Sequence, residues 1–397
     1  MDRLKDPARA YDVVLFGATG FVGELTARYL AAHAPAACRW ALAGRDQEAL
    51  ERLRERLAAV EPRCADLPLL HADATDPDSL RALADSARVV ATTVGPYLWY
   101  GEGLVAACAE AGTDYVDLTG EPEFVDLMYV RHDARARETG ARLVHACGFD
   151  SVPHDLGVYF TVRQLPEGVP LRIDGFVRTN AVFSGGTFAS ALTAMGRGPA
   201  MLRAARERRL HEPRLVDRRA RAPLGAPRYS RETGTWALPL PTLDPGVVAR
   251  SAKALPRYGP DFRYRHYAGV RTLPMALGGV SAVGAGLALA QIPAARRWLM
   301  SRYQPGQGPD AERRARSWFT VRFVGEGGGR RVFTEVSGGD PGYGETAKML
   351  AESALCLAFD TTLPKTAGQV TTAVAMGDAL LERLRAAGIG FRVADLR

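Results

Sequence analysis

Three glycines, Gly17, Gly20 and Gly23, recur every third residue near the start of the chain. They follow the apolar run 13–16, which is typical of a parallel strand buried on both faces, and they precede an apolar helix. Such glycines allow a tight turn, a close approach of pyrophosphate and close helix packing, and the helix N–H groups bind the anion. The segment therefore predicts a dinucleotide site. The residues expected to form it are Gly17, Thr19, Gly20, Phe21, Val22 and Gly23.

The end of the next predicted strand, residues 39–43, indicates which dinucleotide binds. Gly44, Arg45 and Asp46 follow this strand. An acid at this place suits the ribose 2′-hydroxyl of NAD, whereas an arginine suits the 2′-phosphate of NADP. Arg45 directly follows the glycine and favours NADP, with Gly44 and Arg45 as cofactor contacts. Asp46 supports the NAD alternative, or else it is the N-cap of the helix predicted at 47–58.

Two further strand ends should complete the cofactor edge, because functional groups of open parallel sheets lie at the carboxyl ends of strands. Strands are predicted at 67–71 and 89–93. The cofactor contacts expected after them are Asp73, Ala74, Val94, Gly95 and Pro96.

The alternation of strands and helices over residues 11–120 predicts an α/β fold, a Rossmann-type doubly wound parallel sheet. Residues 1–153 are expected to form this NADP-binding domain. Residues 154–343 show strand-like alternation at 171–183 and 316–336, the latter as a hairpin turning at 325–329. They predict a second α+β domain built on an antiparallel sheet. Amphipathic helices within 344–397 should return to the first domain.

Charge in this chain is concentrated in one segment. The net charge is +7, yet residues 197–231 hold eleven arginines against Glu207, Glu212 and Asp217. This arginine-rich segment is either a solvated helix face followed by a loop, or a docking surface for an acidic partner. No nucleic-acid-binding motif accompanies it, so no nucleic-acid partner is expected.

The five cysteines indicate a reducing cytoplasm. Their number is odd and no Cys-x-x-Cys pair occurs, which argues against disulfides and structural zinc. His145 and Cys147 lack a second ligand pair, so no metal site is predicted. The N-terminus lacks the apolar core of a signal peptide.

An uncharged segment at 273–293 is long enough to reach across a bilayer but contains four glycines. Three interpretations stay open. The segment is a buried helix or forms the contact between the subunits of a homodimer, it contacts a membrane surface or an acyl chain, or it crosses the membrane. The arginine pair 296–297 and Trp298 follow it, as at membrane interfaces.

Several common enzyme classes are excluded by missing motifs. A short-chain dehydrogenase needs Tyr-x-x-x-Lys, but the residues four before the lysines are Met1, Ala249, Gly344 and Thr361. The Gly-x-Ser-x-Gly elbow of serine hydrolases and the Walker pattern are also absent.

Seven motifs together resemble the saccharopine dehydrogenase-like oxidoreductases, and more closely their branch of trans-acting enoyl reductases of lipid and polyketide assembly. The resemblance covers nearly the whole chain. Its motifs are GATGFVG at 17–23, Gly44-Arg45, TTVGPY at 92–97, YVDLTGEP at 115–122, CGFDSVPHDLG at 147–157, SGGT at 184–187 and DPGYGETAKM at 340–349.

The resemblance implies an NADPH-dependent reduction of an α,β-unsaturated acyl thioester on a carrier protein. Hydride would reach the β-carbon and a proton the α-carbon, which needs orientation, a polarised carbonyl and a proton source. Tyr97 and Asp150 are the candidate catalytic residues. Tyr97 alternatively packs over the cofactor, and Asp150 alternatively caps a helix starting near Val152.

Weaker candidates and two other functions remain open. Glu121 and His154 are lesser site candidates, and Tyr343 and Glu345 are expected on the substrate side. One alternative function is an amino-acid or imine reductase closer to saccharopine dehydrogenase, although no matching arginine clamps are recognisable. The other is a non-catalytic NADP-binding protein at the inner face of a membrane.

Overall fold

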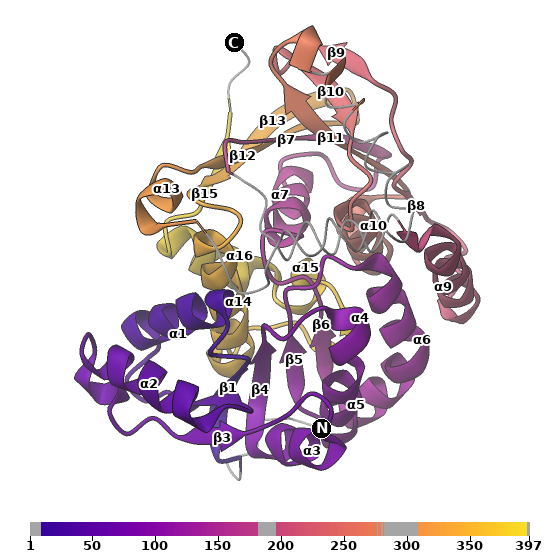
Figure 1. Cartoon of the computed structure of the whole chain (residues 1–397). Coiled ribbons are helices and arrows are strands. Elements are labelled where there is room, and N and C mark those ends of the chain that lie inside the picture. Colours follow the sequence, from indigo (N-terminus) through magenta and orange to yellow (C-terminus); the bar gives the residue numbers. More distant parts are fainter. Residues whose placement is uncertain (1–8, 182–195, 276, 279–280, 282–308, 395–397) are drawn as a thin grey trace. The chain divides into compact units, whose positions relative to one another are not determined.

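The computed structural model describes residues 9–181, 196–275, 277–278, 281 and 309–394, which form two compact units (Figure 1). In the described chain, unit 1 comprises residues 9–148 and 343–383, and unit 2 comprises the rest. The sequence analysis placed this boundary at residue 153 and expected helices within 344–397 to return to the first domain. Unit 1 instead ends at Gly148, whereas residues 343–383 do return to it and the residues after Arg383 belong to unit 2.

Unit 1 is built on a parallel sheet of seven strands in the order β14-β6-β5-β4-β1-β2-β3. Val13, Val14 and Leu15 of the central strand are fully buried, as expected of a strand covered on both faces. The predicted Rossmann-type α/β fold is therefore confirmed. The strands are β1 (Tyr11–Phe16), β2 (Trp40–Gly44), β3 (Leu69–His71), β4 (Ala87–Thr92), β5 (Asp114–Val116), β6 (Arg142–Val144) and β14 (Gly368–Val370).

Helices cover both faces of this sheet (Figure 1). On one face, α1 (Phe21–His33) packs against α2 (Gln47–Ala58) and α14 (Gly344–Phe359), and α14 contacts β1, β4 and β5. On the other, α3 (Pro77–Ser86), α5 (Glu102–Ala111) and α6 (Pro122–Thr139) pack in succession. The short helices of the unit are α4 (Tyr97–Tyr100), η1 (Pro62–Cys64) and α15 (Thr372–Ala375).

Unit 2 is built on a sheet with the strand order β15-β13-β12-β7-β11-β10-β9, and β8 also pairs with β11. The predicted purely antiparallel sheet is corrected to a mixed one, because β11 runs parallel to β7 and β8. Parallel neighbours need a long crossover, and the arginine-rich segment lies within the one that joins β7 to β11. The strands are β7 (Leu171–Thr179), β8 (Arg219–Arg221), β9 (Arg228–Ser230), β10 (Thr235–Pro239), β11 (Asp261–Val270), β12 (Phe319–Gly327), β13 (Arg330–Gly338) and β15 (Gly390–Val393).

Two helices pack against each other and against this sheet. Helix α7 (Val152–Val162) contacts β7, β12 and β13, and α10 (Asp244–Ala254) contacts β8 and β11. Gly157 allows α7 to approach the sheet, since a Cβ there would lie 2.4 Å from the Phe323 ring. The β12–β13 hairpin turns at Gly328 and Gly329, within the predicted range. The other helices here are α9 (Gly198–His211), η2 (Pro256–Tyr258) and α13 (Ala311–Ala315), and α16 (Gly377–Ala386) spans the boundary between the units.

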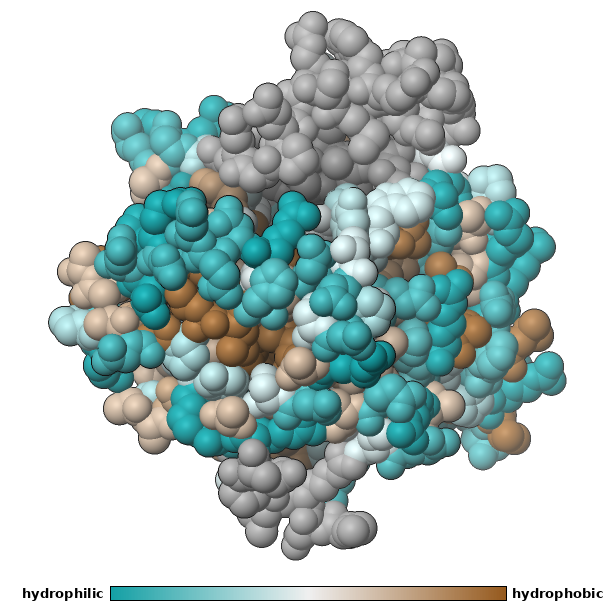
Figure 2. All heavy atoms as spheres, turned by 60° about the horizontal axis from the view of Figure 1, so that its bottom comes forward, coloured by the Kyte–Doolittle hydropathy of each residue, from teal (hydrophilic) through white to brown (hydrophobic). Residues whose placement is uncertain are grey.

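Polar residues cover most of the molecular face shown in Figure 2, with apolar residues gathered between them. Most of the apolar segment 273–293 lies outside the described residues, so its predicted contacts are not addressed. Within the described part of the chain, no helix combines the length and the apolar character needed to cross a membrane.

Candidate active site and its cofactor edge

The glycine turn after β1 has the geometry that its sequence predicts. Gly17 has a φ of +83°, and a Cβ there would lie 2.7 Å from Val94 Cγ2. Thr93 Oγ1 donates to the Gly17 carbonyl oxygen at 2.9 Å and ties this turn to the end of β4. A Cβ at Gly23 would lie 2.1 Å from the Gly17 oxygen, so that glycine lets α1 pack on the turn.

The start of α1 has the features of an anion site. Its N-cap is Gly20, and no side chain caps the helix. A helix N-terminus without a side-chain cap presents backbone N–H groups and the positive end of the helix dipole. Thr19 is exposed beside it, and Phe21 and Val22 are half-buried. Contact of these residues with a pyrophosphate stays a prediction.

At the end of β2, Gly44 is buried and Arg45 is exposed. Among the described residues Arg45 has no ion-pair partner. Asp46 caps α2 by accepting a hydrogen bond from the Ala49 N–H at 2.9 Å, which confirms its predicted capping role. Arg45 is thus the available charged group at this strand end, as a 2′-phosphate requires.

The ends of β3 and β4 complete this edge. Asp73 accepts hydrogen bonds from the backbone N–H and the hydroxyl group of Thr75, at 2.8 and 2.7 Å. These bonds, with a smaller effect of Arg45, lower the pKa of Asp73. Ala74 and Val94 are half-buried, and Gly95 and Pro96 are exposed.

All thirteen predicted cofactor residues lie at or after the carboxyl ends of four adjacent strands, β4-β1-β2-β3, and so along one sheet edge. Their individual contacts with the cofactor stay predictions.

Tyr97 is buried, and its hydroxyl group both donates and accepts a hydrogen bond. It donates to the Thr92 carbonyl oxygen at 3.1 Å and accepts from the Leu118 N–H at 3.1 Å. Burial, followed by the carboxylate of Asp117, raises the pKa of Tyr97 well above its usual value. This geometry gives the hydroxyl a structural role, and the packing of Tyr97 over the cofactor stays a prediction.

Two carboxylates whose structural roles the sequence analysis missed shape the neighbouring loops. Glu121 caps α4, accepting from the N–H groups of Tyr97 and Leu98 at 3.1 and 2.9 Å. Asp117 is fully buried, with the Tyr115 hydroxyl 2.9 Å and His145 Nδ1 2.6 Å from its Oδ2. The acids of the YVDLTGEP motif were the available signal, and their spacing alone did not identify these partners.

Asp150 lies in unit 2, just before α7, and is half-buried. Among the described residues its side chain makes no hydrogen bond, so it does not act as the helix cap that the sequence offered as an alternative. Burial and then the Asp244 carboxylate raise its pKa to about 7, while His154 acts in the opposite direction. A carboxyl group with such a pKa holds a proton near neutral pH.

The two residues expected on the substrate side belong to unit 1. The Tyr343 ring packs edge-on against Phe21, with the ring centroids 4.9 Å apart. Glu345 forms an ion pair with Lys348 at 2.7 Å. Tyr343 therefore contacts a residue of the glycine turn, whereas the role of Glu345 stays a prediction.

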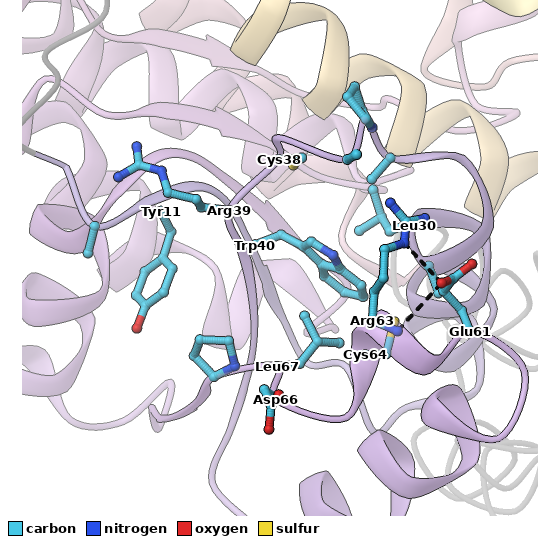
Figure 3. A pocket seen from close by; sticks show the side chains of 16 residues that line it. Tyr11, Leu30, Cys38, Arg39, Trp40, Glu61, Arg63, Cys64, Asp66 and Leu67 are labelled. Carbon is cyan, nitrogen blue, oxygen red and sulfur yellow. Dashed lines mark hydrogen bonds and ion pairs between the residues drawn. The ribbon is translucent and has the colours of Figure 1, made fainter.

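An open pocket of about 360 Å³ lies elsewhere in unit 1 (Figure 3). Tyr11, Arg39 and Trp40, which line it, stand at the amino ends of β1 and β2. This is the opposite end of these strands from the glycine turn, so the pocket is not the dinucleotide site.

Comparison with known proteins agrees with this geometry. Residues 13–144 match the family described as "Saccharopine dehydrogenase NADP binding domain". The chain is 38% identical to a trans-acting enoyl reductase of Mycobacterium bovis BCG, over 96% of this chain and 97% of that protein. It is 41% identical to a Mycobacterium tuberculosis protein provisionally given the same name, over 98% of both chains.

A solved structure shares the fold. Apo saccharopine dehydrogenase (L-Glu forming) from Saccharomyces cerevisiae aligns with a TM-score of 0.55 at 12% identity, covering 96% of this chain and 99% of that one. The chain belongs to the saccharopine dehydrogenase-like oxidoreductases, in the family of the trans-acting enoyl reductases, and its cofactor is NADP(H).

Proposed function

We propose that this protein uses NADPH to reduce the C=C bond of an α,β-unsaturated acyl thioester carried by a separate synthase. The observation that carries the proposal is the similarity to trans-acting enoyl reductases over almost the full length of both chains. The edge formed by the glycine turn and Arg45 supports the choice of cofactor. We further propose that the reaction belongs to lipid or polyketide assembly in the cytoplasm; the motif resemblance supports the pathway, and the odd cysteine count without a Cys-x-x-Cys pair supports the compartment.

The reaction adds two hydrogens, one as a hydride and one as a proton. Bound NADPH supplies a hydride for the β-carbon. The start of α1 would hold the pyrophosphate and Arg45 the 2′-phosphate, which fixes the position of the nicotinamide. A proton must then reach the α-carbon from a protein group or from water.

Asp150 is the proton source that we propose. Of the two catalytic candidates, Tyr97 already uses its hydroxyl as donor and as acceptor inside unit 1. Asp150 keeps a carboxyl group that accepts no hydrogen bond from the described residues. Because the Tyr97 hydroxyl already makes two hydrogen bonds and the Asp150 carboxyl group makes none with the described residues, Asp150 is the better candidate for the proton source.

An acidic carrier protein is the partner that we propose for the arginine-rich segment. Five of its exposed arginines have no ion-pair partner among the described residues: Arg203, Arg206, Arg209, Arg214 and Arg219. Arg208 of the same segment is instead buried and bonded to Glu212 at 2.6 Å. Unpaired surface arginines attract an acidic partner and raise the rate of encounter.

The apolar segment 273–293 is the part of the chain that we propose for contact with an acyl chain, a membrane surface or a second copy of the protein. Its composition alone supports this. Flotation of the purified protein with liposomes and determination of its mass in solution separate the three: only a membrane contact carries the protein upward, and only self-association doubles the mass.

The proposed reaction is tested by incubating the protein with NADPH, or separately with NADH, and an α,β-unsaturated acyl thioester. We expect a product heavier by two hydrogens with NADPH and little with NADH. The same assay with an imine of an amino acid tests the alternative reductase class. Oxidation of NADPH by the imine alone, with the thioester presented both free and on its carrier, would overturn the proposal.

A further inference from the structure

Three metal-ligating side chains of unit 2 converge in its interior. His154 lies in the first turn of α7, Asp244 is the first residue of α10, and His266 lies in β11. Their exposed fractions are 1%, 1% and 3%. Three separate elements of the fold therefore bring two imidazoles and one carboxylate to the same buried place.

Distances within this cluster are short, but the atoms that face one another are poorly aligned for hydrogen bonds. His154 Nδ1 is 3.1 Å from Asp244 Oδ1, and His266 Nε2 is 3.6 Å from Asp244 Oδ2. His154 Nδ1, Asp244 Oδ1 and His266 Nε2 all lack a hydrogen-bond partner within the described structure, although they are buried. At 3.1 Å, the missing bond reflects direction and not separation.

Buried polar atoms without partners cost roughly 1–3 kcal/mol each, so their grouping calls for a single group that satisfies all of them. A cation does this, because it accepts lone pairs that point to a common centre and not to each other. One ligand atom from each residue lies within 4.8 Å of the others. Adjacent ligands of a tetrahedral zinc ion are about 3.4 Å apart, given bonds of about 2.1 Å, so small side-chain movements suffice.

Neighbouring hydroxyl groups orient two of the three ligands. The Tyr264 hydroxyl is 2.8 Å from His266 Nδ1, and Thr242 donates to Oδ2 of Asp244. When His266 Nδ1 donates to Tyr264, the lone pair of Nε2 faces the cluster. Such outer partners are regular features of protein metal sites.

We propose that His154, Asp244 and His266 form a buried site for one divalent transition-metal ion, most suitably Zn²⁺, with water as the fourth ligand. Imidazole and carboxylate ligands suit zinc, and the burial of all three residues excludes substrate from the ion. The ion would join α7, α10 and β11 inside unit 2. Its test measures metal content and does not depend on the proposed reduction.

The rival to a metal ion is a buried ion pair. Burial lowers the pKa of His154, but Asp244 overcomes this and raises it, so a proton can take the place of the ion. Burial lowers the pKa of His266 to about 3, which leaves that ring neutral. The metal site and the ion pair make different predictions: only the metal site requires the purified protein to contain a bound metal ion.

The test uses untagged full-length protein produced with added Zn²⁺ or Co²⁺, because a closed site is filled most readily during folding. We expect about one ion per chain by elemental analysis, and for Co²⁺ a visible absorption band of low-coordinate cobalt. The variants H266N and D244N should bind at least about 10-fold more weakly. His211→Asn, a change at an exposed histidine of α9, should retain the full metal content.

X-ray absorption of the metal-loaded wild type keeps the test decisive if the variants fail to fold. Imidazole and oxygen ligands without sulfur support the site. Sulfur ligation would assign the ion to cysteines and overturn the proposal. So would wild-type protein that holds no stoichiometric metal, which would leave the His154–Asp244 ion pair as the occupant.

Discussion

Arg45 is the residue on which the choice of cofactor depends. It is exposed at the end of β2, while the adjacent Asp46 is committed to capping α2. We expect Arg45→Ala to raise KM for NADPH about 10–100-fold, because a charge-assisted bond to phosphate is lost. KM for NADH should stay within about twofold. Steady-state kinetics with both cofactors measure this.

The matched control for this change is Arg52→Ala in α2. Arg52 is also an exposed arginine, with Glu48 3.5 Å away. It should leave both KM values unchanged. Equal losses with NADPH and NADH in the Arg45 variant would show that this residue supports the fold and does not select the 2′-phosphate.

Asp150 should be needed for turnover and not for cofactor binding. Removal of a general acid typically costs about 10²–10⁴-fold in rate. We therefore expect Asp150→Asn to lower kcat by at least about 10-fold, the amide being unable to donate as an acid does. The dissociation constant of NADPH, measured by fluorescence titration, should not change. A variant with wild-type kcat would leave water as the proton source.

Tyr97 should behave in the opposite way. Its hydroxyl joins the Thr92 carbonyl oxygen to the Leu118 N–H in a buried place. Tyr97→Phe should lower the free energy of unfolding by about 1–3 kcal/mol, because both groups lose a partner. Turnover per folded molecule should be retained. Denaturant titration and kinetics on the same sample separate the two effects, and a stable but inactive variant would restore Tyr97 as a catalytic candidate.

At the scale of elements, α9 presents the positive charge that we propose for carrier docking. Replacement of Arg203, Arg206 and Arg209 by glutamate should raise KM for the carrier-bound substrate about 10-fold or more, since like charges now face each other. Kinetics with a small free thioester should not change. If both substrates lose activity equally, the surface does not dock the carrier.

Helix α9 is also held by a half-buried ionic cluster with a pH signature. Burial raises the pKa of Glu212, but Arg208 and Lys253 overcome this and lower it to about 2. The stability that this carboxylate contributes is therefore full above its unfolded pKa near 4.3 and is lost as pH falls toward 2. Glu212→Gln should cost about 1–3 kcal/mol at pH 7.

That difference in unfolding free energy between wild type and Glu212→Gln should shrink between pH 4.5 and pH 3. Urea titrations of both proteins across this range measure it. A difference independent of pH would indicate that side-chain packing, and not charge, accounts for the loss.

Elements with a strong local pattern were predictable, and elements defined by distant partners were not. The helix 47–58 has an amphipathic pattern and a capping acid, and α2 occupies the same residues. Strand β14 has only three residues and joins the sheet through β6, which is distant in sequence. The amphipathic pattern of residues 371–387 predicts one helix, whereas the structure has α15 and α16 there, and Gly377 between them has a φ of +45°.

For the molecule as a whole, the predictable part was the parallel α/β unit, because its strands are short apolar runs between helices. The glycine turn was predictable because the need for its glycines arises within the turn and the adjoining helix. The cluster of His154, Asp244 and His266 was not, since its members are far apart in sequence and come from three elements. The parallel pairing of β7 and β11 was missed for the same reason.

Helix α14 has a consequence for how the protein is made. It packs on β1, β4 and β5, yet it follows β5 by more than half the length of the chain. Ribosomes add roughly 5–20 residues per second, so the face that α14 covers stays open for about 10–45 s after its strands emerge. A nascent chain halted before residue 344 should therefore bind chaperones that recognise apolar surface, and release should follow only once α14 has been synthesised.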